Sequence, residues 1–246
     1  MSHAQVNPYE SSFNPSTQAV AWAGEWERTV FLRRTYSHLA GAIALFTLLE
    51  FMVFLLVPEQ VLQSTVGFAV SGWNWLFVIG ALMLVSTVAE KFASSATSLS
   101  TQYLGLGLYV VAEAVIFVPL LWFAGRLGPN TITAAALMTG VIFGGLTMMV
   151  FVTRADFSWL GRWLWLAGFG AMGLAICAIL FGFSLGILFS GAMVVLASGY
   201  ILHHTSNVLH HYRTDQYVAA SLALFASVAT LFWYVLRILS IFNSRD

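Results

Sequence analysis

The sequence of 246 residues carries little charge: Asp, Glu, Lys and Arg make up 8% of it, whereas about a quarter is usual in a soluble domain. Its ten basic and ten acidic side chains balance, so no net charge draws the chain to nucleic acid, which we exclude as a partner. Because 59% of the residues are hydrophobic, a soluble globular fold is excluded as well. We therefore expect a protein whose main partner is the lipid bilayer.

Cysteine is nearly absent, and so are the motifs of several enzyme classes. Cys177 is the single cysteine and lies in an apolar run, which excludes an internal disulfide framework. Neither a phosphate-binding Walker loop nor a His-Glu-x-x-His zinc motif occurs. We expect no enzymatic activity, no cofactor and no metal site.

Apolar segments, mostly about 20 residues long and separated by short polar breaks, fill the chain from residue 36 onward. Such a segment, as a helix, crosses ~30 Å of hydrocarbon, and the period-two alternation of a membrane strand is absent. The expected spans are 36–57, 74–90, 103–124, 131–152, 160–182, 184–202 and 217–240. The sequence thus predicts an all-α polytopic membrane protein, a seven-transmembrane helix bundle. Since only residues 182–186 separate the fifth and sixth spans, six spans with one broken helix are the alternative.

The first 30 residues differ from the rest of the chain. Residues 1–23 are rich in Ser, Asn, Gln and Pro and lack a basic start followed by an apolar run, so they are not a signal peptide. We expect residues 1–30 to form a mobile cytoplasmic N-terminal tail and residues 31–246 to form the membrane domain.

Basic residues are unevenly divided between the two sides of the predicted bundle. Seven fall on the side of the N-terminus: Arg28, Arg33, Arg34, Lys91, Arg154, Arg162 and Arg213. Three fall on or near the other side: Arg126, Arg237 and Arg245. The positive-inside rule then predicts a cytoplasmic N-terminus and, with seven spans, a C-terminus on the outside.

Polar side chains within the apolar segments are the candidate functional residues, because they are costly in hydrocarbon. Glu113, near the centre of the third span, is the first candidate; a structural hydrogen bond to a neighbouring helix is an equally good interpretation. Counting the helical rise from each entry places Glu50 and Arg237 at comparable depths. We expect an ion pair between them, with snorkelling of Arg237 to the outer interface as the alternative.

Two histidine pairs, His203 with His204 and His210 with His211, lie two helical turns apart. Seven residues of helix span ~10 Å, which is too far for two ligands of one metal ion. Proton sensing is therefore favoured over metal binding, and a plain interfacial cluster is favoured over both.

The turn before the last span predicts which residues share a depth in the bundle. If residues 213–215 form this turn, His203 and His204 come level with Ser227. A titratable imidazole could then face a hydroxyl group inside the bundle. Together with Glu113, these three side chains make up the expected polar, pH-sensing path.

Three segments near the C-terminus are similar to a known family: His-Thr-Ser-Asn at 204–207, residues 217–225 and residues 231–239. They resemble the Bax inhibitor-1 family, the transmembrane Bax-inhibitor-motif proteins, and the resemblance covers nearly the whole chain from Arg28. It implies a seven-helix bundle whose last helix is surrounded by the other six. It also implies a pH-sensitive calcium leak that uses a pair of aspartates on the sixth and seventh helices.

The chain departs from that aspartate pair. His204 and Ser227 stand where the two aspartates are expected. Thr205-Ser206, Ser227 and the ending at 243–246 are similar to the bacterial YccA branch, which implies an inner-membrane protein that modulates the membrane protease FtsH and is its slow substrate. We therefore expect a regulatory protein whose tail an FtsH-type protease can engage. A pH-sensitive leak for calcium, other cations or protons is the alternative.

Overall fold

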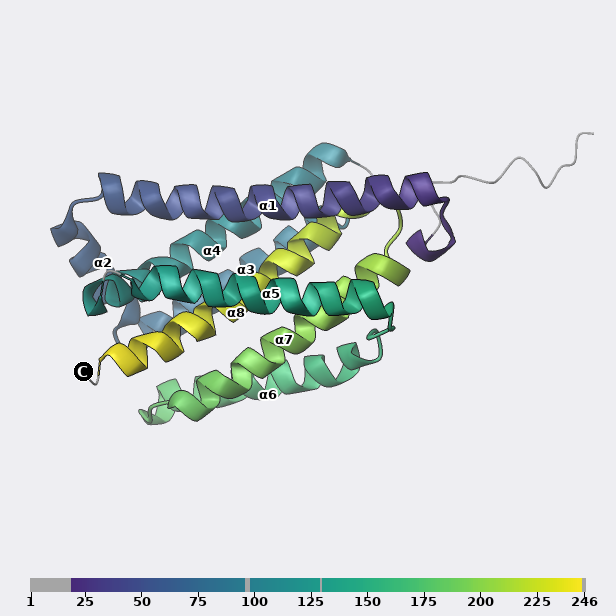
Figure 1. Cartoon of the computed structure of the whole chain (residues 1–246). Coiled ribbons are helices and arrows are strands. Elements are labelled where there is room, and N and C mark those ends of the chain that lie inside the picture. The colour runs from purple at the N-terminus through teal and green to yellow at the C-terminus, as the bar shows by residue number, and fades with distance from the viewer. Residues whose placement is uncertain (1–18, 96–97, 129, 245–246) are drawn as a thin grey trace, which may run out of the picture.

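The computed structural model describes residues 19–95, 98–128 and 130–244. In these ranges a short 3-10 helix precedes eight α-helices, seven of which are long and apolar enough to cross a membrane (Figure 1). The elements are η3 (Val20–Trp22), α1 (Glu25–Leu56), α2 (Glu59–Val70), α3 (Asn74–Ala93), α4 (Leu99–Leu127), α5 (Thr131–Thr153), α6 (Leu160–Phe181), α7 (Ile187–His210) and α8 (Tyr217–Asn243). The predicted all-α bundle with seven long helices is confirmed.

The break between α6 and α7 separates two full helices, so the alternative of one broken helix does not apply. Gly182 ends α6 in a left-handed conformation with φ of 71°, which a glycine adopts without steric cost. Helix α2 was not predicted. It is too short to cross a membrane, and it buries Leu62 and Val66 against the bundle.

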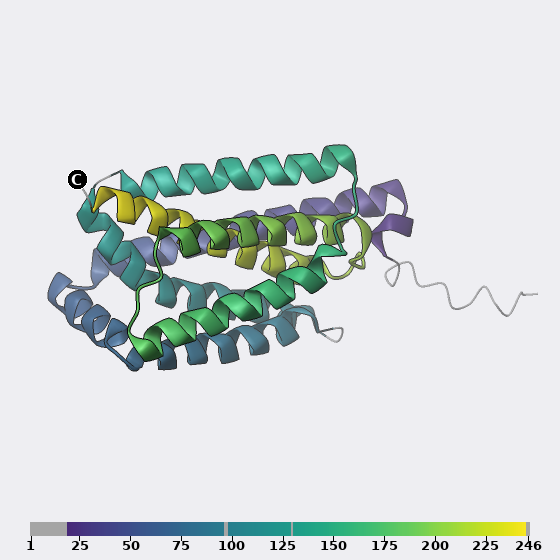
Figure 2. The same ribbon diagram turned by 90° about the horizontal axis from the view of Figure 1, so that it is seen from below.

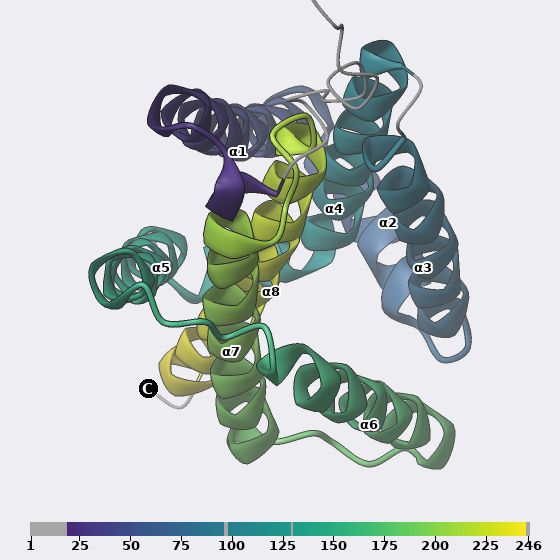
Figure 3. The same ribbon diagram turned by 90° about the vertical axis from the view of Figure 1, so that its right-hand side faces the viewer.

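Helix α8 is the central element of the bundle. It packs against α1, α3, α4, α5 and α7, and α6 lies outside it against α7 (Figure 3). Its buried residues lie on all sides of the helix and include Leu224, Phe225, Leu231 and Leu236, as expected for a helix that is apolar all round. The predicted central position of the last helix is confirmed.

The two ends of the bundle differ in charge. One end holds the start of α1 and the connections α3–α4, α5–α6 and α7–α8, and we call it the basic end (Figure 1). Its basic residues are Arg28, Arg33, Arg34, Lys91, Arg154, Arg162 and Arg213. The other end, which holds α2, the connections α4–α5 and α6–α7 and the end of α8, is the distal end.

The described part of the predicted tail is folded onto the bundle. The backbone N–H of Val20 donates to the carbonyl oxygen of Tyr212 at 2.8 Å, and Ala19 forms an isolated bridge with Arg213. Val20 is fully buried, and α1 already begins at Glu25. The prediction of a mobile tail is therefore wrong for residues 19–30, because an apolar side chain anchors them; residues 1–18 lie outside the described ranges.

Helices α3 and α4 pack with their backbones in contact at Gly105. A Cβ atom at this position would lie 2.5 Å from both the Ala89 carbonyl oxygen and the Ala93 nitrogen. Two residues further along the same helix, a Cβ atom at Gly107 would meet nothing within 4 Å. Only the first glycine is thus required for close helix packing.

We expect Gly105→Ala to lower the free energy of unfolding by about 1–3 kcal/mol, because the added methyl group forces two backbones apart. Gly107→Ala is the matched control and should leave stability unchanged or slightly higher. Thermal unfolding of the purified proteins in one detergent measures both effects. Equal unfolding temperatures for Gly105→Ala and the wild type would contradict the close packing.

Candidate functional site

A cavity of about 600 Å³ lies beside the central helix, between α3, α4, α6, α7 and α8. Helix α6 runs close to α7 at the basic end and diverges from it towards the distal end, and their connection crosses that end (Figures 2 and 3). The cavity lies where the helices diverge. Its walls are mainly apolar, and its polar side chains are Glu113, Ser184, Thr230, Tyr234 and Arg237.

Glu113 is the deepest charged group of this cavity. It lies on α4 and is 9% exposed, and the hydroxyl of Tyr109, one helical turn earlier, hydrogen-bonds to its carboxyl group. The ring of Tyr109 packs edge-on against Phe225 of α8. The candidate residue is thus held in place by a neighbour on its own helix, and it lines the cavity.

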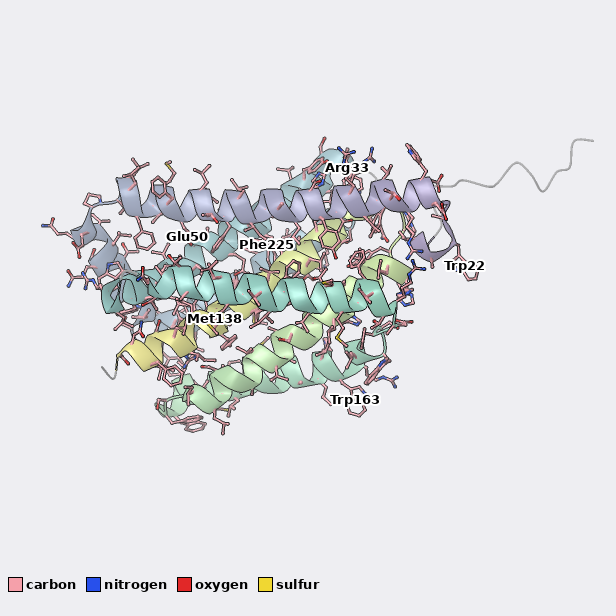
Figure 4. The ribbon with its side chains drawn as sticks, viewed as in Figure 1. Trp22, Arg33, Glu50, Met138, Trp163 and Phe225 are labelled. Atoms are coloured by element: carbon pink, nitrogen blue, oxygen red, sulfur yellow. The ribbon has the colours of Figure 1, made fainter. Side chains whose placement is uncertain are left out.

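Arg237 lies at the distal side of the cavity and does not reach Glu50. Its Nη2 donates to the carbonyl oxygen of Leu185 at 2.7 Å and ties the α6–α7 connection to α8. Glu50 is 6% exposed, and neither of its carboxylate oxygens has a hydrogen-bond partner among the described residues. Figure 4 shows Glu50 on the side of α1 that faces the bundle.

The predicted ion pair between Glu50 and Arg237 is therefore not formed. The depth of the two residues was estimated from helical rise alone, which leaves the direction of each side chain around its helix open. Arg237 belongs to the face of α8 that lines the cavity, and α1 contributes no wall to that cavity. Arg237 thus faces the cavity, whereas Glu50 of α1 is not part of its wall.

At the basic end, His203 holds the connection between α5 and α6 against α7. Its Nδ1 donates to the carbonyl oxygen of Phe157 at 3.3 Å, so its Nε2 accepts from the Asn207 amide at 3.0 Å. The ring lies so close to Gly161 that a Cβ atom there would be 2.6 Å from Cε1 of the imidazole. This histidine is a structural contact between α6 and α7.

Asp156 is the carboxylate that contacts His211 of the second histidine pair. Its side chain accepts hydrogen bonds from the Ser158 backbone N–H at 2.8 Å and from the Ser206 hydroxyl at 3.1 Å, and His211 Nε2 lies 3.3 Å from its other oxygen. The Ser158 N–H and these two side chains lower the pKa of Asp156 to about 2. Asp156 was not among the candidate residues predicted from the sequence, although an Asp followed two residues later by a Ser is a common turn signal.

The other expected members of the polar path are engaged elsewhere. His204 is half-buried and stacks on Tyr200, with ring centroids 5.8 Å apart, and the hydroxyl of Ser227 donates to the Ala223 carbonyl oxygen of its own helix at 2.9 Å. Of the four expected residues, Glu113 lines the cavity, whereas His203, His204 and Ser227 do not. The structure therefore does not bring the four side chains together at this cavity, and the pH-sensing role of His203, His204 and Ser227 stays a prediction.

Two further features concern possible chemistry in the described part of the chain. Nowhere in it do three His, Cys, Asp or Glu side chains come together as a metal site would require. Residues 182–186 read Gly-x-Ser-x-Gly, the pattern of a hydrolase nucleophile elbow, which needs a strand before the serine. Here helix α6 precedes Ser184, so the pattern lacks the context of an elbow.

Comparison with known proteins gives matches over nearly the whole chain. The family model "Inhibitor of apoptosis-promoting Bax1" matches residues 28–244. Bax inhibitor 1 from Schizosaccharomyces pombe is 25% identical over 253 aligned positions, which cover 99% of this chain and 88% of that protein. Protein lifeguard 4 from Mus musculus is 26% identical over 240 positions, covering 96% and 94%. An uncharacterized protein from Helicobacter pylori is 26% identical over 234 positions, covering 90% and 91%.

The lowered pKa of Asp156 predicts a specific dependence of stability on pH. Since the folded pKa lies below the ordinary value of 3.8, the ionised carboxylate stabilises the fold above about pH 4 and loses this effect as the pH falls towards 2. The unfolding temperature of Asp156→Asn should therefore be lower than that of the wild type between about pH 5 and 7. The difference should shrink as the pH approaches that of the folded pKa, and a difference that stays constant would contradict it.

Proposed function

We propose a regulatory function on the premise that this chain belongs to the Bax inhibitor-1 family, whose model matches residues 28–244. The protein is a multi-pass membrane protein that contacts the lipid bilayer through its seven long apolar helices. Our proposal is that it modulates membrane-protein quality control by an FtsH-type protease in a bacterial inner membrane, and that it has no enzymatic activity of its own. It would act as a YccA-like binding partner of that protease.

The docked segment at residues 19–22 is the observation that supports this function best. The contact of Val20 with Tyr212 fixes the point at which residues 1–18 join the bundle, and that point lies at the basic end. We assign the basic end to the cytoplasm by the positive-inside rule, which leaves the C-terminus outside. A cytoplasmic ATPase ring could then grip residues 1–18 while the bundle stays folded in the membrane.

The contacts of His204 and Ser227 also favour regulation over calcium conduction. Calcium prefers several oxygen ligands, carboxylates above all. At the two positions where the family resemblance implies aspartates, this chain has an imidazole stacked on Tyr200 and a hydroxyl bonded to its own helix. Neither group offers a negative charge to a divalent cation.

Deletion of residues 2–18 should lengthen the half-life of the protein in cells that contain the protease, because it removes the polar terminal segment that we propose the ATPase grips. The deletion leaves the Val20 anchor in place, so the unfolding temperature in detergent should not change. A variant in which residues 2–18 are scrambled is the matched control, since it keeps a handle of the same length and composition. An unchanged half-life after the deletion would remove the tail from this proposal.

A cation or proton leak is the second candidate function, and the cavity beside Glu113 favours it. An open cavity of about 600 Å³ with a carboxyl group on its wall is the kind of site in which a cation or a proton could be held inside a membrane. Arg237 lines the same cavity on the side nearer the distal end. A guanidinium group there opposes the entry of divalent cations from that side.

Flux measurements in liposomes separate the two functions. We expect no acid-activated calcium flux above that of protein-free liposomes, because the described part of the chain has no carboxylate pair between α7 and α8. Glu113→Gln should then behave like the wild type. Flux through the wild type that Glu113→Gln abolishes would replace the regulatory proposal with the leak.

A further inference from the structure

A second, smaller hollow lies between α1 and α4 near the basic end, well away from the distal cavity. It has a volume of about 310 Å³, with His38 and Tyr103 at one end and Leu45 and Val110 at the other. Leu45 and Tyr103 are each 40% exposed, so the hollow is open along the surface of the bundle. We call it the α1–α4 groove.

The end of the groove that lies nearest the basic end is polar. His38 Nδ1 donates to the Arg34 carbonyl oxygen at 2.6 Å, so its Nε2 accepts from the Tyr103 hydroxyl at 3.0 Å. Arg34 precedes His38 by one helical turn and lies over the Tyr217 ring, 5.4 Å from its centre. Arg34 forms no ion pair with any described carboxylate, so its charge is available to an anion.

The remainder of the groove is an apolar trough with two glycines in its walls. Gly41 on α1 and Gly107 on α4 both line it, and a Cβ atom at either position would meet nothing within 4 Å. Neither glycine is therefore needed for contact between the helices. Their missing side chains leave open space along the trough.

The direction and length of the groove match one leaflet of a bilayer. Arg34, His38, Gly41 and Leu45 follow one another at helical spacing on one face of α1. Ser37, at the polar end, and Leu45 are separated by ~12 Å of helical rise, close to the ~15 Å of hydrocarbon in one leaflet. Charge thus lies at the membrane surface and apolar walls extend towards the bilayer centre.

We propose that the α1–α4 groove binds one anionic phospholipid from the leaflet at the basic end. Its phosphate group lies at Arg34, and one acyl chain lies along the trough over Gly41 and Gly107. The guanidinium group selects a negatively charged head group. The apolar trough favours a lipid over free phosphate, because an acyl chain packs against its walls and free phosphate has no apolar group to place there.

Lipid retention by the purified protein tests this site. Native mass spectrometry in detergent, with phosphatidylglycerol or phosphatidylcholine added, should show one retained phosphatidylglycerol per chain and several-fold less phosphatidylcholine. Arg34→Gln should remove this preference, whereas Arg34→Lys should keep most of it. Arg33→Gln is the matched control, because Arg33 is an exposed neighbour that points away from the bundle (Figure 4), and it should behave like the wild type.

Filling the trough gives an independent test of the acyl-chain position. Gly41→Leu with Gly107→Leu should abolish retention, and the unfolding temperature without lipid should stay within a few degrees because both positions are open. Gly140→Leu on α5, also in open space, is the control. Retention that survives the double substitution would overturn the proposal, as would equal retention of the two lipids. If inorganic phosphate alone raised the unfolding temperature as much as phosphatidylglycerol does, that result would overturn the proposal, because it would show an anion site without a lipid.

Discussion

A hydroxyl group in hydrocarbon has no water to bond, so the hydroxyls of the central helix must find acceptors within the protein. Ser221 meets this constraint between two helices: it lies 2.6 Å from the Tyr217 carbonyl oxygen of α8 and 2.8 Å from the Thr35 carbonyl oxygen of α1. Thr230 donates to the Ala226 carbonyl oxygen one turn earlier. Ser221 and Thr230 are satisfied in this way, whereas the buried hydroxyl of Ser240, near the distal end of α8, has no hydrogen-bond partner among the described residues. Local bonding of the first two lets other helices enclose that part of α8.

Aromatic packing then holds the enclosing helices together. Phe117 of α4 meets Phe46 of α1 and Trp233 of α8 edge-on, with ring centroids 5.0 Å apart in both pairs. Phe225 of α8 lies against Phe46 at 6.1 Å. Such pairs add ~0.5–1.5 kcal/mol each beyond the burial of their area. This cluster joins α1, α4 and α8 at mid-depth, between the α1–α4 groove and the distal side of the bundle.

The two ends of the bundle are built differently as a result. At the basic end, short connections are fastened by specific polar contacts, namely Asp156 with Ser206 and Val20 with Tyr212. At the distal end, α6 diverges and leaves a cavity in which Arg237 bonds the α6–α7 connection. The basic end is therefore the better surface for a fixed contact with a partner. The distal half has the space in which a small molecule or an ion could be held.

Much of the architecture could be predicted from the sequence, because a chain in hydrocarbon must bond all its backbone polar groups internally and few folds do so. Scarce charge and long apolar segments required membrane helices, and the all-round apolar character of residues 217–240 is consistent with a helix enclosed by others. Helix α2 was not predicted, because its twelve residues are too few to form a long apolar segment in the sequence. The docked segment at residues 19–22 escaped because one buried valine has no sequence signature.

The candidate sites show that the depth of a residue in the bundle is not enough to predict which side chains touch. Helical rise gives the height of Glu50, Arg237, His204 and Ser227 within the bundle, but contact also depends on the rotation of each helix about its axis and on its tilt. Those two quantities come from side-chain packing between helices, which residues in sequence order do not reveal. The sequence by itself thus determined the membrane helices and which polar residues lie within them. Only the tertiary structure decided that Glu113 lines a cavity, that Asp156 contacts His211, and that Glu50 and Arg237 do not pair.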